Sequence, residues 1–166
     1  FYIFHRYLSV YAYLGRRDFT KAREHFTKAN DWSGLGLVCL GEHQLAEARR
    51  CFRRAKDGAG EGLVLLAERN YDAALTRFSG ADHASYRGLA LLGKRDYEKA
   101  MAKFRSANDF SGMALVYLAK REFGKALELA TQANDLSAQG QVALGQRDFD
   151  TAIAHFTAAN DLSGLS

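Results

Sequence analysis

The stretch RDYEKAMAKFRSANDFS, which runs from Arg95 to Ser111, decides the fold of this chain. Five related stretches recur elsewhere, and together they fill most of the sequence. The residue that opens each copy falls every 26 positions without a slip, at Phe19, Leu45, Tyr71, Tyr97, Phe123 and Phe149. A fixed period of this length is typical of a repeat array, in which each unit packs against its neighbours. The period therefore predicts about six units of 26 residues.

The quoted stretch carries the pattern of an amphipathic helix, which we call the second helix of each unit. Its apolar residues, Tyr97, Ala100, Phe104 and Ala107, share one helical face. Residues suited to the N-cap precede the opening position at Asp18, Asn70, Asp96 and Asp148. Residues that tolerate the left-handed conformation close the helix at Asn30, Asn108, Asn134 and Asn160. Both ends of the second helix are thus predicted from side-chain chemistry.

A shorter first helix is expected in each unit. The segments are residues 33–41, 59–67, 85–93, 111–119 and 137–145. Their candidate N-caps are Ser33, Ser85, Ser111 and Ser137. A strand is the rival interpretation of runs such as LVCL, but no period-2 alternation surrounds them. Because these segments are apolar on every side, we expect them to be buried between second helices and neighbouring units.

Small residues recur at two positions of the first helix. One column is Gly36, Gly62, Gly88, Ala114 and Gly140, and the other is Gly15, Gly41, Ala67, Gly93, Ala119 and Gly145. A glycine inside a helix costs about 1 kcal/mol relative to alanine. Its repetition at one phase therefore predicts close approach between helices of adjacent units.

Composition agrees with a helical array. The 166 residues contain no proline, and 48% of them are hydrophobic. The expected fold is all-α, an α-solenoid of helix-turn-helix repeats that spans residues 1–166 as one array. The expected helix pairs are 5–30, 33–56, 59–82, 85–108, 111–134 and 137–160, with 161–166 starting a further, truncated repeat.

The spacing of Gly88, Leu92, Tyr97, Ala100, Phe104 and Ala107 resembles the tetratricopeptide repeat. The departures are a period of 26 where the family has 34, and the missing Trp-x-x-Leu opening and closing proline. The resemblance implies a shortened α-solenoid whose first helices line a concave face. It implies that a partner contacts the helix starts Ser33, Ser85, Ser111 and Ser137 and the column Leu37, Leu63, Leu89, Leu115 and Gln141.

Chemistry-bearing residues do not converge. The histidines, His5, His25, His43, His83 and His155, are scattered, and the two that share a phase lie five units apart. Cys39 and Cys51 lie on the two helices of one unit, where a redox pair is conceivable but buried free thiols are favoured. We expect no enzyme, no catalytic residues, no cofactor and no metal site.

Charge defines a second group of candidates. The net charge is +4, but residues 1–56 carry +6 (11 basic, 5 acidic) and residues 122–166 carry −4 (2 basic, 6 acidic). This asymmetry could favour head-to-tail self-association or one binding polarity for a partner, but drift among solvent-facing positions is the favoured interpretation. A basic edge is formed by Arg17, Arg69, Arg95, Arg121 and Arg147; we favour ion pairs with the acidic column Asp31, Asp57, Asp109, Asp135 and Asp161, or links to helix-end carbonyls. The densest basic patch is RRCFRRAK, residues 49–56. Nucleic acid is disfavoured, because the aromatic residues occupy core phases and leave none to stack on bases.

A protein-interaction or assembly scaffold that binds a peptide or protein partner is the expected function, since solenoids expose extended surfaces. The alternatives are a purely structural stretch of a long scaffold in a large complex, and RNA binding through the basic edge. Two cysteines form no disulfide framework, which favours an intracellular, cytoplasmic setting. No apolar run is long enough for a membrane span.

Overall fold

The computed structural model describes residues 19–79 and 81–165, and the regular elements within these ranges are all helices. Contacts divide the chain into two compact units, one ending at Arg77 and the other running from Phe78 to Leu165. His5, Gly15, Arg17 and Asp18, named above, lie outside the described residues.

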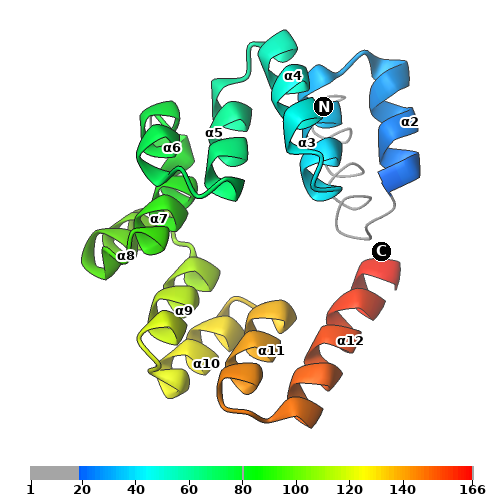
Figure 1. Ribbon diagram of the computed structural model, residues 1–166. Helices are drawn as coiled ribbons and strands as arrows, with labels where there is room; N and C mark the ends of the chain where they lie inside the picture. Colours follow the sequence, from blue (N-terminus) through cyan, green and yellow to red (C-terminus); the bar gives the residue numbers. More distant parts are fainter. Residues whose placement is uncertain (1–18, 80, 166) are drawn as a thin grey trace. The chain divides into compact units, whose positions relative to one another are not determined.

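The first unit contains five described helices that pack in sequence order (Figure 1). They are α2 (Phe19–Ala29), α3 (Trp32–Gly41), α4 (Leu45–Ala55), α5 (Gly58–Ala67) and α6 (Tyr71–Arg77). Each helix packs against the next, and the first helices α3 and α5 also touch each other. The core of this unit therefore lies between first and second helices, as a stacked repeat requires.

The second unit repeats the same arrangement. It consists of the 3₁₀ turn η1 (Ala81–His83), α7 (Ala84–Gly93), α8 (Tyr97–Ser106), α9 (Phe110–Ala119), α10 (Phe123–Gln132), α11 (Leu136–Gly145) and α12 (Phe149–Leu165). Consecutive helices again pack on one another, and first helices touch the next first helix at α7–α9 and α9–α11. The expected all-α, solenoid-like repeat is confirmed.

Turns of two or three residues explain the short period. After α7, the Arg95 amide donates to the Leu92 carbonyl and the Asp96 amide donates to the Leu91 carbonyl, both at 2.9 Å. This is the Schellman arrangement, and Arg95 takes the left-handed conformation it needs, with φ 62°. Asp96 is also the N-cap of α8. The same residue therefore completes the Schellman motif at the end of α7 and begins the next helix.

The opposite turn is built in the same way. Asn108 has φ 52°, and the Asp109 amide donates to the Phe104 carbonyl at 2.9 Å. Asn30 and Asn134 share this left-handed conformation, as predicted. Since both of these turns leave only three residues between consecutive helices, a pair of helices fits within 26 positions.

Aspartates, not serines, cap the first helices, so the serine prediction is wrong. The carboxylates of the capping residues accept from the backbone amide three residues on, at Asp31, Asp57, Asp109 and Asp135. Each of Ser33, Ser111 and Ser137 is instead the second residue of its helix. The sequence offered Asp and Ser two residues apart, and the Schellman turn places the Asp at the cap. The predicted second-helix caps Asn70, Asp96 and Asp148 are confirmed.

Buried phenylalanines lie between glycines of successive first helices. A Cβ added at Gly36 would meet the Phe52 ring at 2.6 Å, and a Cβ at Gly60 would overlap the same ring. Phe104 is enclosed in the same way by Gly88 and Gly112. Both rings are fully buried. The predicted close approach of helices therefore rests on aromatic rings that fill the space of missing side chains.

One repeat departs from the pattern at the boundary of the two units. The pair expected over 59–82 ends at Arg77, because α6 has only seven residues. Here the sequence has His83 where other repeats have the capping aspartate, and His83 makes no cap bond to α7. Its Nδ1 instead lies 2.9 Å from the Ser79 carbonyl oxygen. With the aspartate cap absent, a 3₁₀ turn replaces the regular junction.

The last described helix also differs from expectation. α12 runs without a break from Phe149 to Leu165, through Asn160, where a turn into a truncated repeat was expected. In other repeats the Asn-Asp turn is held by the first helix that follows it.

Candidate functional site

The column expected to contact a partner lies on the partly open side of the first helices. Leu89 is 36% exposed, and Leu37, Leu63 and Leu115 are half-buried. Gln141 continues the column as an exposed polar residue. Their composition predicted that the first helices are buried on every side. The structure instead leaves one side of them partly open to solvent. Four apolar side chains at one repeat position retain contact with solvent.

The serines of the expected site have separate roles. The Ser33 hydroxyl donates to the Asp57 carboxylate at 2.9 Å, while the other oxygen of that carboxylate accepts from the Gly60 amide at 2.8 Å. Ser33 thus ties α3 to the cap of the next first helix. Ser85 is half-buried near the start of α7.

An open hollow of about 410 Å³ brings Ser111 and Ser137 together in the second unit. Its other lining residues are Ala133, Asn134, Asp135, Leu136 and Ala159. The hollow lies at the starts of α9 and α11 and extends to α12. Two hydroxyls, an amide and a carboxylate thus border a small apolar floor. Such a lining suits a polar turn or chain segment of a partner.

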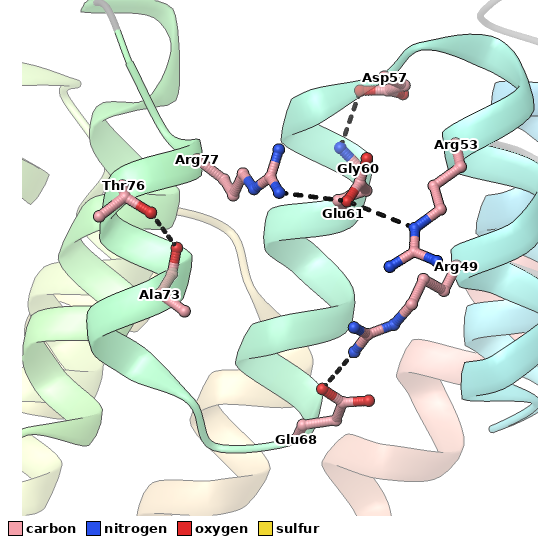
Figure 2. Close-up of polar contacts among 9 residues, drawn as sticks. All are labelled: Arg49, Arg53, Asp57, Gly60, Glu61, Glu68, Ala73, Thr76 and Arg77. Atoms are coloured by element: carbon pink, nitrogen blue, oxygen red, sulfur yellow. Dashed lines mark hydrogen bonds and ion pairs between the residues drawn. The ribbon is translucent and has the colours of Figure 1, made fainter.

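The basic patch on α4 is largely neutralised within the first unit. Figure 2 shows Arg49 pointing to Glu68, and Glu61 lying between Arg53 and Arg77. The Glu61 oxygen is 3.9 Å from Arg53 Nε and 3.6 Å from Arg77 Nη2. These carboxylates come from α5 and its C-cap, so the charges are shared between repeats. Glu61 and Glu68 therefore offset part of the positive charge of the patch.

The two remaining arginines of this patch also have partners. Arg50 pairs with Glu47 at 3.2 Å along α4. The Arg54 guanidinium lies 3.8 Å from the centre of the Trp32 ring, which is a cation–π contact. A nucleic-acid backbone would have to displace these contacts to bind here.

The predicted basic edge is exposed and is not paired as expected. Arg69, Arg95, Arg121 and Arg147 all occupy left-handed turn positions, and their side chains are exposed. Among the described residues, none of the four forms an ion pair with the acidic column. Four aspartates of that column cap helices instead, namely Asp31, Asp57, Asp109 and Asp135. The arginines do reach helix-end carbonyls, but through their backbone amides.

Ion pairs that the sequence analysis missed connect the first repeats of the chain. Arg23 pairs with Glu42, and Arg49, which is 26 residues further on, pairs with Glu68. Both pairs join a second helix to the end of the following first helix, 19 residues away. The sequence period could have predicted these two ion pairs. Arg23 and Arg49 lie 26 residues apart, and so do Glu42 and Glu68.

Cys39 and Cys51 are buried free thiols in one core cluster, as favoured from the sequence. Arg23 Nη2 lies 3.8 Å from Cys39 Sγ while it also binds Glu42. Burial, followed by the neighbouring Cys39, raises the pKa of Cys51. Both features keep Cys51 protonated at neutral pH, so the pair is better suited to packing than to nucleophilic chemistry.

In the part of the chain that the structure describes, no three His, Cys, Asp or Glu residues are placed to hold a metal ion. Over the same residues, no helix combines the length and apolar character needed to cross a bilayer.

Comparisons of this chain with protein-family models, with curated proteins and with solved structures found no match. Among the surfaces described above, the leucine column with the hollow near it is the apolar one that the helical repeat leaves open to a partner.

Proposed function

We propose that this chain is a shortened tetratricopeptide-like array that serves as a protein-interaction scaffold. The helical-hairpin repeat and the consensus spacing of residues such as Gly88, Tyr97 and Phe104 support the comparison with that family. An array of this kind binds through an extended surface, with affinity drawn from area and a few anchoring side chains.

The single observation that carries the proposal is the partly open leucine column. Leu89 and Leu115 stand at equivalent positions of consecutive repeats, and neither is closed by packing within the second unit. The hollow with Ser111 and Ser137 adds polar groups beside the next repeat. An apolar strip next to hydrogen-bonding groups suits an amphipathic helix or an extended apolar peptide.

The other candidate functions draw less support. RNA binding through α4 would require arginines that are now held by Glu61, Glu68 and Trp32. A purely structural role was expected to go with fully buried first helices, whereas the leucine column keeps contact with solvent. The interaction role therefore agrees best with the geometry.

Capture of partners from the native source tests the proposal. The double variant Leu89→Glu/Leu115→Glu should lose a stoichiometric partner that the wild-type chain retains, because a charge would be buried at the contact. The matched control is Leu127→Glu on α10, since Leu127 is 40% exposed and lies on a second helix. We expect the control to bind as the wild type does.

Affinity measured on the captured partner completes the test. We expect the double variant to raise Kd by at least about tenfold, which is about 1.4 kcal/mol. A partner that binds the double variant as tightly as the wild type would remove the leucine column from the interface. Steep weakening with added salt would instead indicate a phosphate-backbone ligand.

A further inference from the structure

Three arginines of the basic edge lie at equivalent turns of the second unit. Arg95, Arg121 and Arg147, which we call the turn arginines, are each the second residue after the end of a first helix. All three side chains are exposed. The backbone of each is held by the hydrogen bonds of its turn, for example from the Arg121 amide to the Leu118 carbonyl at 3.0 Å. The point from which each side chain starts is therefore fixed relative to its helix.

The turns themselves do not call for arginine. The turn arginines have φ of 62°, 62° and 65°. A left-handed backbone is costly for most residues and is best tolerated by glycine and asparagine. The opposite turns of the same unit have asparagine at the left-handed position, at Asn108 and Asn134. Arginine thus occupies a position that suits asparagine better, which points to a role for its side chain.

The acidic residues next to the turn arginines are engaged by other groups. The Asp96 carboxylate accepts from the Lys99 ammonium at 2.8 Å. Glu122 pairs with Lys120 at 3.3 Å and with Lys125 at 2.8 Å. Among the described residues, no carboxylate forms an ion pair with a turn arginine. Three guanidinium groups are therefore left for a ligand from outside the chain.

The packing of the first helices sets the spacing of the turn arginines. The helices α7, α9 and α11 contact one another in order. Helices in contact lie about 8–10 Å apart, so arginines at equivalent positions of these helices repeat at about that interval. An extended chain advances about 3.3 Å per residue, so three of its residues cover about 10 Å. The turn arginines therefore match an extended segment with an acidic residue at every third position.

Charge favours such a segment over a continuous phosphate backbone. Residues 78–165 carry no net charge (10 basic, 10 acidic), so the second unit as a whole does not attract a polyanion. Each turn arginine is also followed by an acidic residue, at Asp96, Glu122 and Asp148. A phosphate backbone would meet these carboxylates as well as the arginines. A peptide with separated acidic residues places them opposite the arginines alone.

We propose that the turn arginines bind an extended acidic segment of a protein partner, with an acidic side chain at every third residue. Each guanidinium offers a planar pair of donors to one carboxylate. Exposed ion pairs are individually weak, so the affinity depends on all three forming together. The site is separate from the leucine column, which lies within the first helices, and it binds whether or not that column has a partner.

Nuclear magnetic resonance titration of the isotope-labelled 166-residue chain at low ionic strength tests the proposal. The probe is a synthetic peptide of three Glu-Ser-Thr repeats, and the comparison peptide has the same composition with its three glutamates adjacent. We expect the spaced peptide to bind more tightly and to shift the amide signals of the turns after α7, α9 and α11. Added salt should weaken this binding, because attraction between exposed charges is screened.

Asparagine variants remove the charge and keep the turn, since asparagine already occupies the left-handed position at Asn108 and Asn134. The triple variant Arg95→Asn/Arg121→Asn/Arg147→Asn should raise Kd at least about tenfold, and its Tm should not fall. Arg121→Asn alone should raise Kd severalfold. The matched control is Arg105→Gln, which removes one exposed charge from the far end of α8 and should bind as the wild type does.

Several results would overturn the proposal. They are equal binding by the triple variant, signal shifts confined to residues outside the turns, and no preference for the spaced peptide. A single-stranded oligonucleotide that binds more tightly than the peptide, and that the triple variant no longer binds, would replace the acidic segment with a phosphate ligand.

Discussion

The ring of Phe104 packs against the backbone of Gly88, so closely that a Cβ at position 88 would lie 2.6 Å from the ring's Cε1 atom. Phe104 is fully buried, and Gly112 of the following first helix encloses it from the other side. The second helix α8 thus packs, through Phe104, between the successive first helices α7 and α9. Stability is therefore shared across junctions and is not held within single repeats.

Gly88→Leu should destabilise the protein by about 1–3 kcal/mol, because the new side chain overlaps a buried ring. Thermal melting followed by circular dichroism should show a lower Tm and a broader transition, as the junction between α7, α8 and α9 loosens. Wild-type-like melting would contradict the close-approach account.

Gly124→Leu provides the matched control for this variant. A Cβ at Gly124 meets no atom within 4 Å, and the residue lies in the first turn of α10. The substitution removes a poor helix former without creating a clash. We expect unchanged or slightly higher stability, by at most about 1 kcal/mol.

Asp109→Ala should cost about 1 kcal/mol of unfolding free energy, because the Asp109 carboxylate accepts from the Gly112 amide at 2.7 Å. Chemical denaturation measures this loss. Ser111→Ala, two residues on, should cost less, since Ser111 does not cap α9. The opposite ranking would restore serine as the cap.

Acid should weaken the start of α8. A hydrogen bond from the Lys99 ammonium, then one from its backbone amide, lowers the pKa of Asp96 below its ordinary value. The folded chain thus holds this proton less readily than the unfolded chain, so stability is present above the ordinary pKa and is lost as the pH falls through the lowered one.

The variant Asp96→Asn isolates this contribution, since asparagine still caps a helix but does not titrate in this range. Melting temperatures between neutral and acid pH should fall less steeply for Asp96→Asn than for the wild type. Equal slopes would show that Asp96 does not contribute to the acid sensitivity.

Thiol labelling should be slow in the native protein. Cys39 is fully buried, Cys51 is 5% exposed, and burial raises the pKa of Cys51, so little thiolate is present to react. An aromatic disulfide reagent followed by absorbance should label both thiols rapidly only in denaturant. The exposed thiol of a Ser137→Cys variant should react at once, and native cysteines that react equally fast would contradict their burial.

Much of the architecture could be predicted because the signals are local and are repeated. Tyr97, Ala100 and Phe104 mark the buried face of a helix through their spacing alone. The N-terminal boundaries of the first helices were harder to predict from the sequence. Asp109 and Ser111 are both good N-cap residues, and the turn before them decides which one caps the helix. The short α6 was also missed, in a repeat where Gly80, Asp82 and His83 all depart from the residues that other repeats have at these positions.

The candidate surfaces were predicted less completely than the fold. The leucine positions followed from the resemblance, but their partial exposure depends on how neighbouring helices cover them. The sequence predicted that Arg49 and Arg53 belong to one basic stripe. Their ion pairs with Glu68 and Glu61 form only when the helices pack together.

The sequence by itself determined the period, the helical class and the place of each phenylalanine, because these depend on the spacing of side chains along one helix. Tertiary structure alone decided which residues meet across repeats. It paired Phe104 with two glycines, gave the aspartates to helix ends and left Phe149 uncovered. Such contacts join residues of different helices, so they are fixed only when the helices pack.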